Sequence, residues 1–519
     1  MGLRCLRPLA LTGAFWLLCA LGSGTGFAQP TGALTLVDAV RGTLDRQPDI
    51  QLQGKQVEIQ DGAVQEAGGQ FDLNLEAFAG ADHADIPKSA LDQLLQTQRV
   101  TDSTIYGTGV SRQFRNGVSV RPGVRVDRID TDDPNYPTTN RTRVDFVVVV
   151  PLLKGLGRTA ADAAELAAER EYQNSLLELR HTTSQALYRT IVSYWHYQAA
   201  TQSLEQLRQS EERAERFIRE LEKLIAGDER PAADLDQMVA ERAGKTAARI
   251  AGEQRLVQAR TELGLAMGLP SEQIPKLALP RDPFPPVQPR DIALLTRQAP
   301  TIADRAVHRR ADYQALLGRR ETGKILLEKA RNNLLPQVDL NLKLGYSGLK
   351  EGNSPADSVQ SYAENVPGLS AGAAVKLQWP FENNSARGRY RQIKAGYERI
   401  VISGDDLDRT IRSRVAVSVS EVEKASARLA KSSEAVRAYR QTVQNELTKY
   451  HMGIATLIDL TTVENQLIDA SLKEIAAAAD HAAAVATLRF ETATLIAGEG
   501  EEASLDQSFW TTLPRLPME

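Results

Sequence analysis

The sequence predicts an α+β membrane protein in which a partial β-barrel is continued by a long α-helical tunnel, built from two internal repeats. Three observations support this fold class: very long helical patterns, short strand segments with one wholly apolar face, and an order of elements that occurs twice. At 1.5 Å per residue, a helical pattern of ~68 residues makes a rod of roughly 100 Å, longer than a compact domain needs.

The N-terminal residues 1–28 are typical of a signal peptide. Arg4 and Arg7 precede an apolar run, and small residues ending at Ala28 follow it. An uncleaved anchor is the alternative, and a lipoprotein signal is less favoured because Leu18 stands where a small residue should precede Cys19. Export of the mature chain is therefore expected.

Composition excludes several classes of protein. The 519 residues are 42% hydrophobic and 25% charged, enough for large cores. Both cysteines lie within residues 1–28, so the mature chain has neither a disulfide framework nor a thiolate metal site. A net charge of -4 gives no sign of nucleic-acid binding.

The first repeat is expected at residues 29–268. Its barrel strands fall within 71–151, where apolar and polar residues alternate and Asn116-Gly117 predicts a tight hairpin turn. A long helical hairpin follows over 158–267, and its tip is placed near Gly227, where the helical pattern breaks.

Residues 269–299 are rich in proline and predict an extended linker. The second repeat, 300–497, has barrel strands within 336–381 and a helical hairpin over 384–496, and 498–519 form a C-terminal tail. The second tip is placed near Gly453, because glycine readily adopts the left-handed conformation that ends a helix.

The number of strands in the first repeat stays open between two and four. Polar loops at 80–103 and 130–142, with a tight turn between them, favour counting 104–129 as two wall strands, although Pro122 is an objection. Four to six strands cannot enclose a lumen, since small barrels need about eight. The chain is therefore expected to oligomerise, with neighbouring chains completing one barrel.

These residues resemble the TolC-type outer-membrane factor family over nearly the whole mature chain. The resemblance includes the repeat, Leu335-Pro336 before a strand, and the sequence PLLKGLG after another. Its most specific part is Tyr450-x-x-Gly453, followed by LIDL at 457–460.

The resemblance implies a homotrimer in the cell outer membrane, in contact with outer-membrane lipid and with a large periplasmic portion. It implies a passive channel for efflux or type I secretion, partnered by a periplasmic adaptor and an inner-membrane transporter. No cofactor is implied. The alternative function is a periplasmic coiled-coil scaffold or adaptor without a pore, which would have no use for the one-sided strands. The sequence identifies neither the cargo nor the class of inner-membrane pump.

Transferred residue by residue, the resemblance places Asp459, Tyr450 and Thr462 at the periplasmic aperture. Ala455 and Thr462 replace an arginine and an aspartate of the family's best-known pattern, so a closing salt-bridge network is not predicted. The alternatives from the residues themselves are a helix-start carboxylate for Asp459 and ordinary packing for Tyr450. Adaptor-facing tips are expected at four residues: Gly227, Asp228, Gly453 and Ile454.

Trp379 and Tyr346 are expected to be anchors at the barrel rim, with ordinary strand residues as the alternative. The sequence does not favour catalysis or a metal site. Its six histidines are scattered, and no HExxH motif is present.

Overall fold

The computed structural model describes residues 32–87, 98–132, 136–227, 231–363, 368–496 and 510–514. The predicted signal peptide, Asp228 and most of the predicted tail lie outside this range. The chain divides into two compact units. We term Met1–Lys55, Leu177–Gln314 and Asp406–Glu519 the helical unit, and Gln56–Leu176 and Ala315–Asp405 the strand unit.

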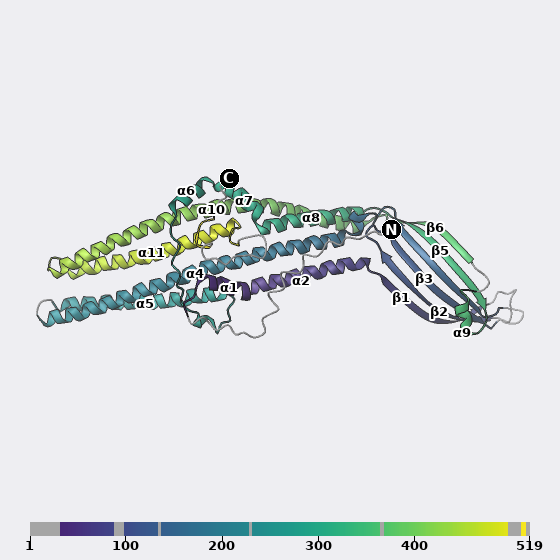
Figure 1. Cartoon of the computed structure of the whole chain (residues 1–519), viewed down its shortest axis with the longest axis horizontal. Helices are drawn as coiled ribbons and strands as arrows, with labels where there is room; N and C mark the ends of the chain where they lie inside the picture. The colour runs from purple at the N-terminus through teal and green to yellow at the C-terminus, as the bar shows by residue number, and fades with distance from the viewer. Residues whose placement is uncertain are drawn as a thin grey trace, which may run out of the picture. The chain divides into compact units, whose positions relative to one another are not determined.

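The strand unit contains an antiparallel sheet of six strands in the order β1-β2-β3-β4-β5-β6 (Figure 1). The first half of the sequence supplies four of these strands and the second half supplies two, which answers the question left open by the sequence. The strands are β1 (Asn74–Pro87), β2 (Gln98–Gln113), β3 (Ser119–Thr131), β4 (Thr139–Pro151), β5 (Gln337–Glu351) and β6 (Gly368–Gln378).

Pro122 lies inside β3 without breaking the sheet. It is opposite Phe146 on β4, whereas the β2–β3 pairing is interrupted between Gly109↔Gly123 and Arg112↔Val120. The register is the same on both sides of this interruption. A proline has no N–H to donate, so a local gap in one ladder accommodates it.

Two predicted loops are shorter than expected. β1 continues to Pro87 and β2 begins at Gln98, so most of 80–103 is strand, and β4 begins at Thr139 within the predicted loop 130–142. Backbone pairing continues here through polar residues, for example Asp82↔Ser103. The sequence prediction was wrong because it ended each strand where apolar alternation ended, while the ladder depends on main-chain groups. The loop after β5 also contains a short helix, α9 (Pro355–Gln360).

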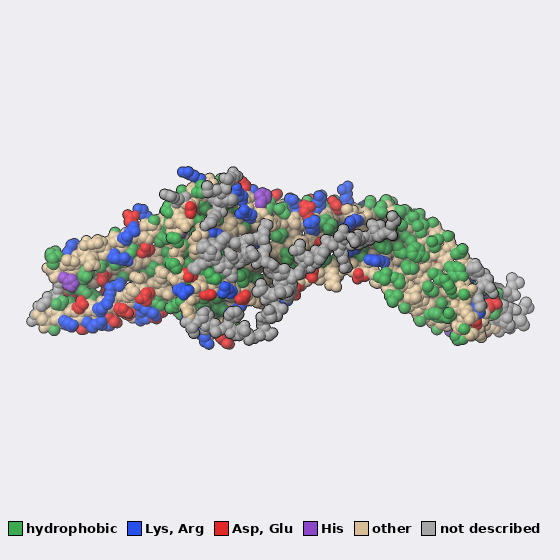
Figure 2. Space-filling model, viewed as in Figure 1, with side chains coloured by type: hydrophobic (Ala, Val, Ile, Leu, Met, Phe, Trp, Pro, Cys, Tyr) green, Lys and Arg blue, Asp and Glu red, His purple; other side chains and the backbone are tan. Residues whose placement is uncertain are grey.

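The register places apolar side chains on one face of all six strands. For example, Leu342 is opposite Val148 on β4 and Ala373 on β6, and hydrophobic side chains cover much of the sheet in Figure 2. Charged residues such as Lys343 and Asp145 occupy the opposite face, where their side chains are 3.2 Å apart. The predicted one-sided alternation is therefore confirmed.

Parts of four longer helices complete the strand unit together with the sheet. They are most of α2 (Pro48–Gly68) and of α8 (Ala311–Asn332), the start of α4 (Ala163–Ala226) and the start of α10 (Asn384–His451). Arg319 on α8 forms an ion pair with Glu171 on α4, with 3.2 Å between the charged atoms. The helical pattern predicted from residue 158 is interrupted at Asp162, which ends the short helix α3 (Arg158–Ala161).

In the helical unit two antiparallel hairpins are formed, α4 with α5 and α10 with α11, as Figure 1 shows. The hairpin helices α5 and α11 have 34 and 35 residues, whereas α1, α6 and α7 are short. The bounds are α1 (Leu36–Arg46), α5 (Ala233–Ala266), α6 (Pro289–Arg297), α7 (Ala299–Arg309) and α11 (Leu457–Glu491). Among the described residues, no helix has both the length and the apolar character needed to cross a membrane.

The main core of the helical unit surrounds Tyr194 and Trp195 on α4, which are fully buried and meet edge to face with 5.2 Å between ring centroids. The N-terminal segment packs here: Leu34 pairs with Pro280, and Asp282 accepts hydrogen bonds from the Leu36 N–H at 2.6 Å and from the Tyr194 hydroxyl at 2.7 Å. The core thus fixes the proline-rich segment against the long helix.

The predicted extended linker is only partly extended. The short 3-10 helix η2 (Ile274–Lys276) lies within it, and α6 begins at Pro289. Proline fits the first turn of a helix because the N–H that it lacks has no partner there. The sequence prediction assigned all the prolines of 269–299 to an extended linker and missed this helix start.

The two halves of the chain share one local feature. α1 and α7 are 11 residues long, and each is followed by one extended residue and a longer helix, α2 (Pro48–Gly68) or α8. The extended residues have nearly equal torsion angles, φ -63° and ψ 119° for Gln47, and φ -67° and ψ 122° for Arg310.

Candidate functional site

The tips of the two hairpins lie in the helical unit and pack together. α10 ends at His451, and Gly453 follows with a φ of +72°, the left-handed conformation that the sequence predicts. α4 ends at Ala226, and Gly227 is the exposed turn residue after it. Both glycines end helices in the structure, and their contact with an adaptor stays a prediction.

Tyr450 joins the two hairpins rather than pointing into solvent. Its side chain is 3% exposed, and its ring lies 5.5 Å from that of Phe217 on α4. Leu221, Met238 and Leu457 belong to the same cluster. The single chain thus gives Tyr450 a packing role, and its place at an aperture remains untested. The sequence did not reveal Phe217 as its partner.

Asp459 begins α11 as part of a capping box with Thr456. Its carboxylate accepts hydrogen bonds from the Thr456 N–H at 2.9 Å and from the Thr456 hydroxyl at 2.6 Å, while the Asp459 N–H donates to that hydroxyl oxygen at 3.2 Å. These hydrogen bonds lower the pKa of Asp459. The carboxylate is exposed and ionised at neutral pH, so the local capping role leaves its charge available to solutes.

Thr462 is exposed one turn further along α11. Exposed apolar side chains surround Gly453 at the same tip: Met452, Ile458 and Ile454, of which Ile454 is 72% exposed. Such a patch on a helix turn is typical of a surface that contacts another protein.

A buried polar network links the hairpins above the tips. Lys245 on α5 donates to Asn465 on α11 at 3.1 Å and to Ser210 on α4 at 3.3 Å. Asn465 in turn donates to Glu241 on α5 at 2.7 Å. This network could not be predicted from the sequence, because its members are distant in the chain and look like ordinary helix-surface residues.

The two predicted rim residues lie towards opposite ends of β5 and β6. Trp379 follows the last residue of β6, is 56% exposed and stacks on Phe381. Tyr346 is opposite Leu369, near the start of β6, and its hydroxyl donates to the Tyr362 carbonyl at 3.0 Å. Their role as membrane anchors stays a prediction.

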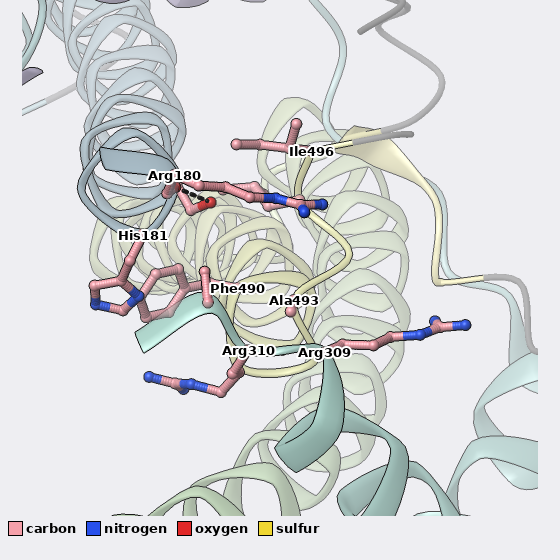
Figure 3. Close-up of a pocket in the computed structure, with 10 residues that line it drawn as sticks. Arg180, His181, Arg309, Arg310, Phe490, Ala493 and Ile496 are labelled. Carbon is pink, nitrogen blue, oxygen red and sulfur yellow. Dashed lines mark hydrogen bonds between the residues drawn. The ribbon is translucent and has the colours of Figure 1, made fainter. Parts of the chain in front are cut away.

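Figure 3 shows a small pocket at the end of α11, with arginine side chains around Phe490. Arg310 is buried there and bonds both Glu491 and Asp312, so its charge is compensated. Burial lowers the pKa of His181 beside it. Among the described residues no cluster of three or more His, Cys, Asp or Glu could hold a metal ion. The pocket has the character of an internal ion-pair network.

Comparison with known proteins identifies the second half of the sequence. Residues 303–493 match the family model for outer membrane efflux protein. This part of the chain is similar to the outer membrane efflux protein family. No curated protein matches the sequence.

Solved structures extend the likeness to most of the chain. The outer-membrane channel OprN is 15% identical with a TM-score of 0.62, covering 88% of this chain and 89% of that chain. CmeC of Campylobacter jejuni is 11% identical with a TM-score of 0.65, covering 88% and 85%. VceC of Vibrio cholerae is 15% identical with a TM-score of 0.62, covering 88% and 95%. At these identities the structures establish a shared fold.

Proposed function

We propose that this protein is the outer-membrane channel component of a tripartite efflux or type I secretion system. It conducts solutes passively from a periplasmic adaptor and an inner-membrane transporter to the exterior. The observation that carries the proposal is the apolar band that crosses all six strands on one face of the sheet, which suits contact with lipid. The family match and the shared fold support the same function.

The open sheet supports assembly into a homotrimer. Among the described strands, β1 and β6 each have a neighbour on one side only, which leaves two free edges. Three copies of the six-stranded sheet would supply eighteen strands, a number that encloses a water-filled channel. Pairing β6 of one copy with β1 of the next removes every edge.

Exposed apolar residues on the helices support the same assembly. Ile250 on α5 and Ile402 on α10 are more than half exposed in a single chain. Neighbouring copies of the long helices would cover such positions and enclose a tunnel. The similar breaks at Gln47 and Arg310 support the view that the chain consists of two repeats.

The positions of the aromatic residues fit a membrane-spanning wall. Leu369, the cross-strand partner of Tyr346, and Trp379 are ten positions apart in the sequence. This spacing is about 33 Å along a strand, or about 25 Å along the membrane normal for a tilt of about 40°. The apolar band of an outer-membrane barrel has about that height, so the two aromatic residues would mark its two boundaries.

The hairpin tips would meet the adaptor, with Gly453 and Ile454 in the exposed apolar patch and Gly227 and Asp228 at the other tip. Asp459, Tyr450 and Thr462 would belong to the periplasmic aperture. The cell outer membrane, with a large periplasmic portion, is the location that follows. A pore-free periplasmic scaffold is the alternative function, but it would leave the apolar sheet face without a partner.

The test is to express the full chain with its N-terminal segment, fractionate the membranes and reconstitute the purified protein in planar lipid bilayers. We expect a detergent-requiring outer-membrane oligomer whose electrophoretic mobility changes on heating, and discrete conductance steps in the bilayer. A soluble periplasmic monomer without conductance would contradict the proposal and favour the scaffold.

A further inference from the structure

The polar face of the sheet carries a group of arginines on β3 and β4 around one carboxylate. We term Arg121, Arg125, Arg141 and Arg143 the arginine cluster, and Asp127 is the carboxylate within it. We propose that the arginine cluster is a binding site, termed the binding station, for multivalent anionic groups on solutes that pass through the lumen. This proposal rests on the proposed channel function.

The register brings three of these arginines together around Asp127, whereas Arg121 lies four residues before Arg125 on β3, opposite Val147. Arg125 is directly opposite Arg143, and Asp127 is directly opposite Arg141. Opposed side chains in an antiparallel pair lie about 5 Å apart at Cβ, where like charges destabilise the pair. Arg125 and Arg143 are nevertheless opposed, because both donate hydrogen bonds to the carboxylate of Asp127, Arg125 at 2.5 Å.

One carboxylate does not neutralise four guanidinium groups. Asp127 forms ion pairs with Arg125 and Arg143. Neither Arg121 nor Arg141 forms an ion pair with any described residue. Both are exposed on the polar face. The cluster with Asp127 therefore carries a local charge of about +3.

The other charged residues on this face either face a residue of opposite charge or lie away from the cluster. Asp145 is paired with Lys343, and Asp339 on β5 is opposite Lys376 on β6. The remaining carboxylates lie on β1 and at the end of β5: Glu76, Asp82 and Glu351. The positive charge is thus concentrated on β3 and β4 rather than averaged over the sheet.

Small residues lie beside the cluster on the same face. Gly107 is opposite Arg125, and Gly109 is opposite Gly123. The Phe78 side chain fills the position over Gly107, since a Cβ on Gly107 would lie 2.7 Å from its ring. Arg121 and Arg141 are themselves exposed, so a solute can approach their guanidinium groups from the polar face.

The chemistry of guanidinium defines the ligand. Its planar set of N–H donors matches the oxygens of carboxylate and phosphate groups in pairs, and it stays charged at all working pH values. Several guanidinium groups spread along one face of two paired strands favour an anion that carries more than one such group. Repetition of the cluster in each copy of a closed barrel would make a positive ring in the lumen.

The experiment measures planar-bilayer currents of the wild-type channel and of the double variant Arg121→Gln/Arg141→Gln. Sodium tripolyphosphate added on the side of the strand loops is expected to block wild-type current, and the variant is expected to need about tenfold more of it. In a KCl gradient the reversal potential of the variant should shift towards cation preference. The matched control is Arg128→Gln, on the same strand but on the opposite face, where Arg128 bonds Asn353.

The outcomes separate the two proposals. If both proteins conduct, and the double variant has the same reversal potential and needs the same tripolyphosphate concentration for block as wild type, the binding station is overturned. The channel function would remain intact. Arg128→Gln removes one charge and the double variant removes two, so an effect of Arg128→Gln at least half as large as that of the double variant would also overturn it, because the effect would then reflect net charge alone. Absence of any wild-type conductance would instead refute the channel function on which the station depends.

Discussion

Arg310 and Glu491 form a buried ion pair although 181 residues separate them in the sequence. Arg310 is 5% exposed and also bonds Asp312, with 2.7 Å between Nη2 and Oδ2. Burial by itself would raise the pKa of Asp312, but the hydrogen bonds and charge of Arg310 outweigh burial and hold that pKa below its usual value. The pair fixes the junction of α7 and α8 against the end of α11.

We expect Arg310→Ala to lower the free energy of unfolding by about 3 kcal/mol, because it leaves the buried Glu491 with only the exposed Arg414, whose Nη1 is 3.9 Å from Oε1. Thermal unfolding followed by circular dichroism in detergent measures the effect. The control is Arg412→Ala, which removes exposed ion pairs with Asp304 and Asp408 and should cost about 0–1 kcal/mol. Equal losses in both variants would show that the buried pair has no special role.

Tyr194→Phe should destabilise the helical unit by about 1–3 kcal/mol, because the buried Asp282 carboxylate loses a hydrogen-bond donor. Burial also raises the pKa of the Tyr194 hydroxyl, which therefore stays protonated and donating. Tyr188→Phe is the matched control, since that hydroxyl is only partly buried and lies 3.3 Å from Thr487. Chemical denaturation compares the two variants, and a larger loss in Tyr188→Phe would refute the assignment.

Stability should fall as the pH decreases below about 6.5, the usual pKa of histidine in an unfolded chain. Burial lowers the pKa of His481 and of His181 in the folded protein. The unfolded chain therefore binds these protons first, and the loss continues until the pH reaches the lower folded pKa. The slope is at most about 1.4 kcal/mol per pH unit for each histidine.

Unfolding temperatures at pH 7.5 and 5.5 measure this dependence. We expect His481→Gln to reduce the difference between the two temperatures, whereas His451→Gln, at an exposed position, should leave it unchanged. A wild-type unfolding temperature that rises on acidification would contradict the predicted sign.

Asp459→Asn should weaken the cation preference of the channel, since it removes the exposed charge while keeping an oxygen that can accept the Thr456 hydrogen bonds. Thr456→Ala is the control, because it breaks the capping box and keeps the charge. Reversal potentials in a KCl gradient distinguish the variants. If only Thr456→Ala changes selectivity, Asp459 acts through helix capping and has no place at the aperture.

Leu342→Arg should reduce the yield of assembled channel, because it places a charge on the apolar face at a cost of about 2–4 kcal/mol near the bilayer midplane. Asn341→Arg, one residue earlier, puts the same side chain on the polar face and should be tolerated. Heat-modifiable electrophoresis of outer-membrane fractions measures both yields. Equal yields would mean that the apolar face does not contact lipid.

Features set by short-range periodicity could be predicted from the sequence. The alternating faces of β5 and β6, the turn at Asn116-Gly117 and the helix end at Gly453 each depend on a few neighbouring residues. Glycine at a φ of +72° is nearly free of steric cost, so its position in a helical pattern is informative by itself.

Features set by contacts across the chain could not be predicted. Phe217 packs on Tyr450, and Trp510 of the tail is buried and donates to the Leu495 carbonyl at 3.1 Å. Nothing near either residue in the sequence identifies its partner. Strand ends were also missed, because main-chain pairing continues where side-chain alternation has stopped.

The two free edges of the sheet limit how the width of such a pore can change. Each subunit adds six strands to the barrel wall, so the circumference of the barrel changes only in steps of six strands. Adding or removing a single hairpin requires a change in the gene, and that change then appears in every subunit of the barrel.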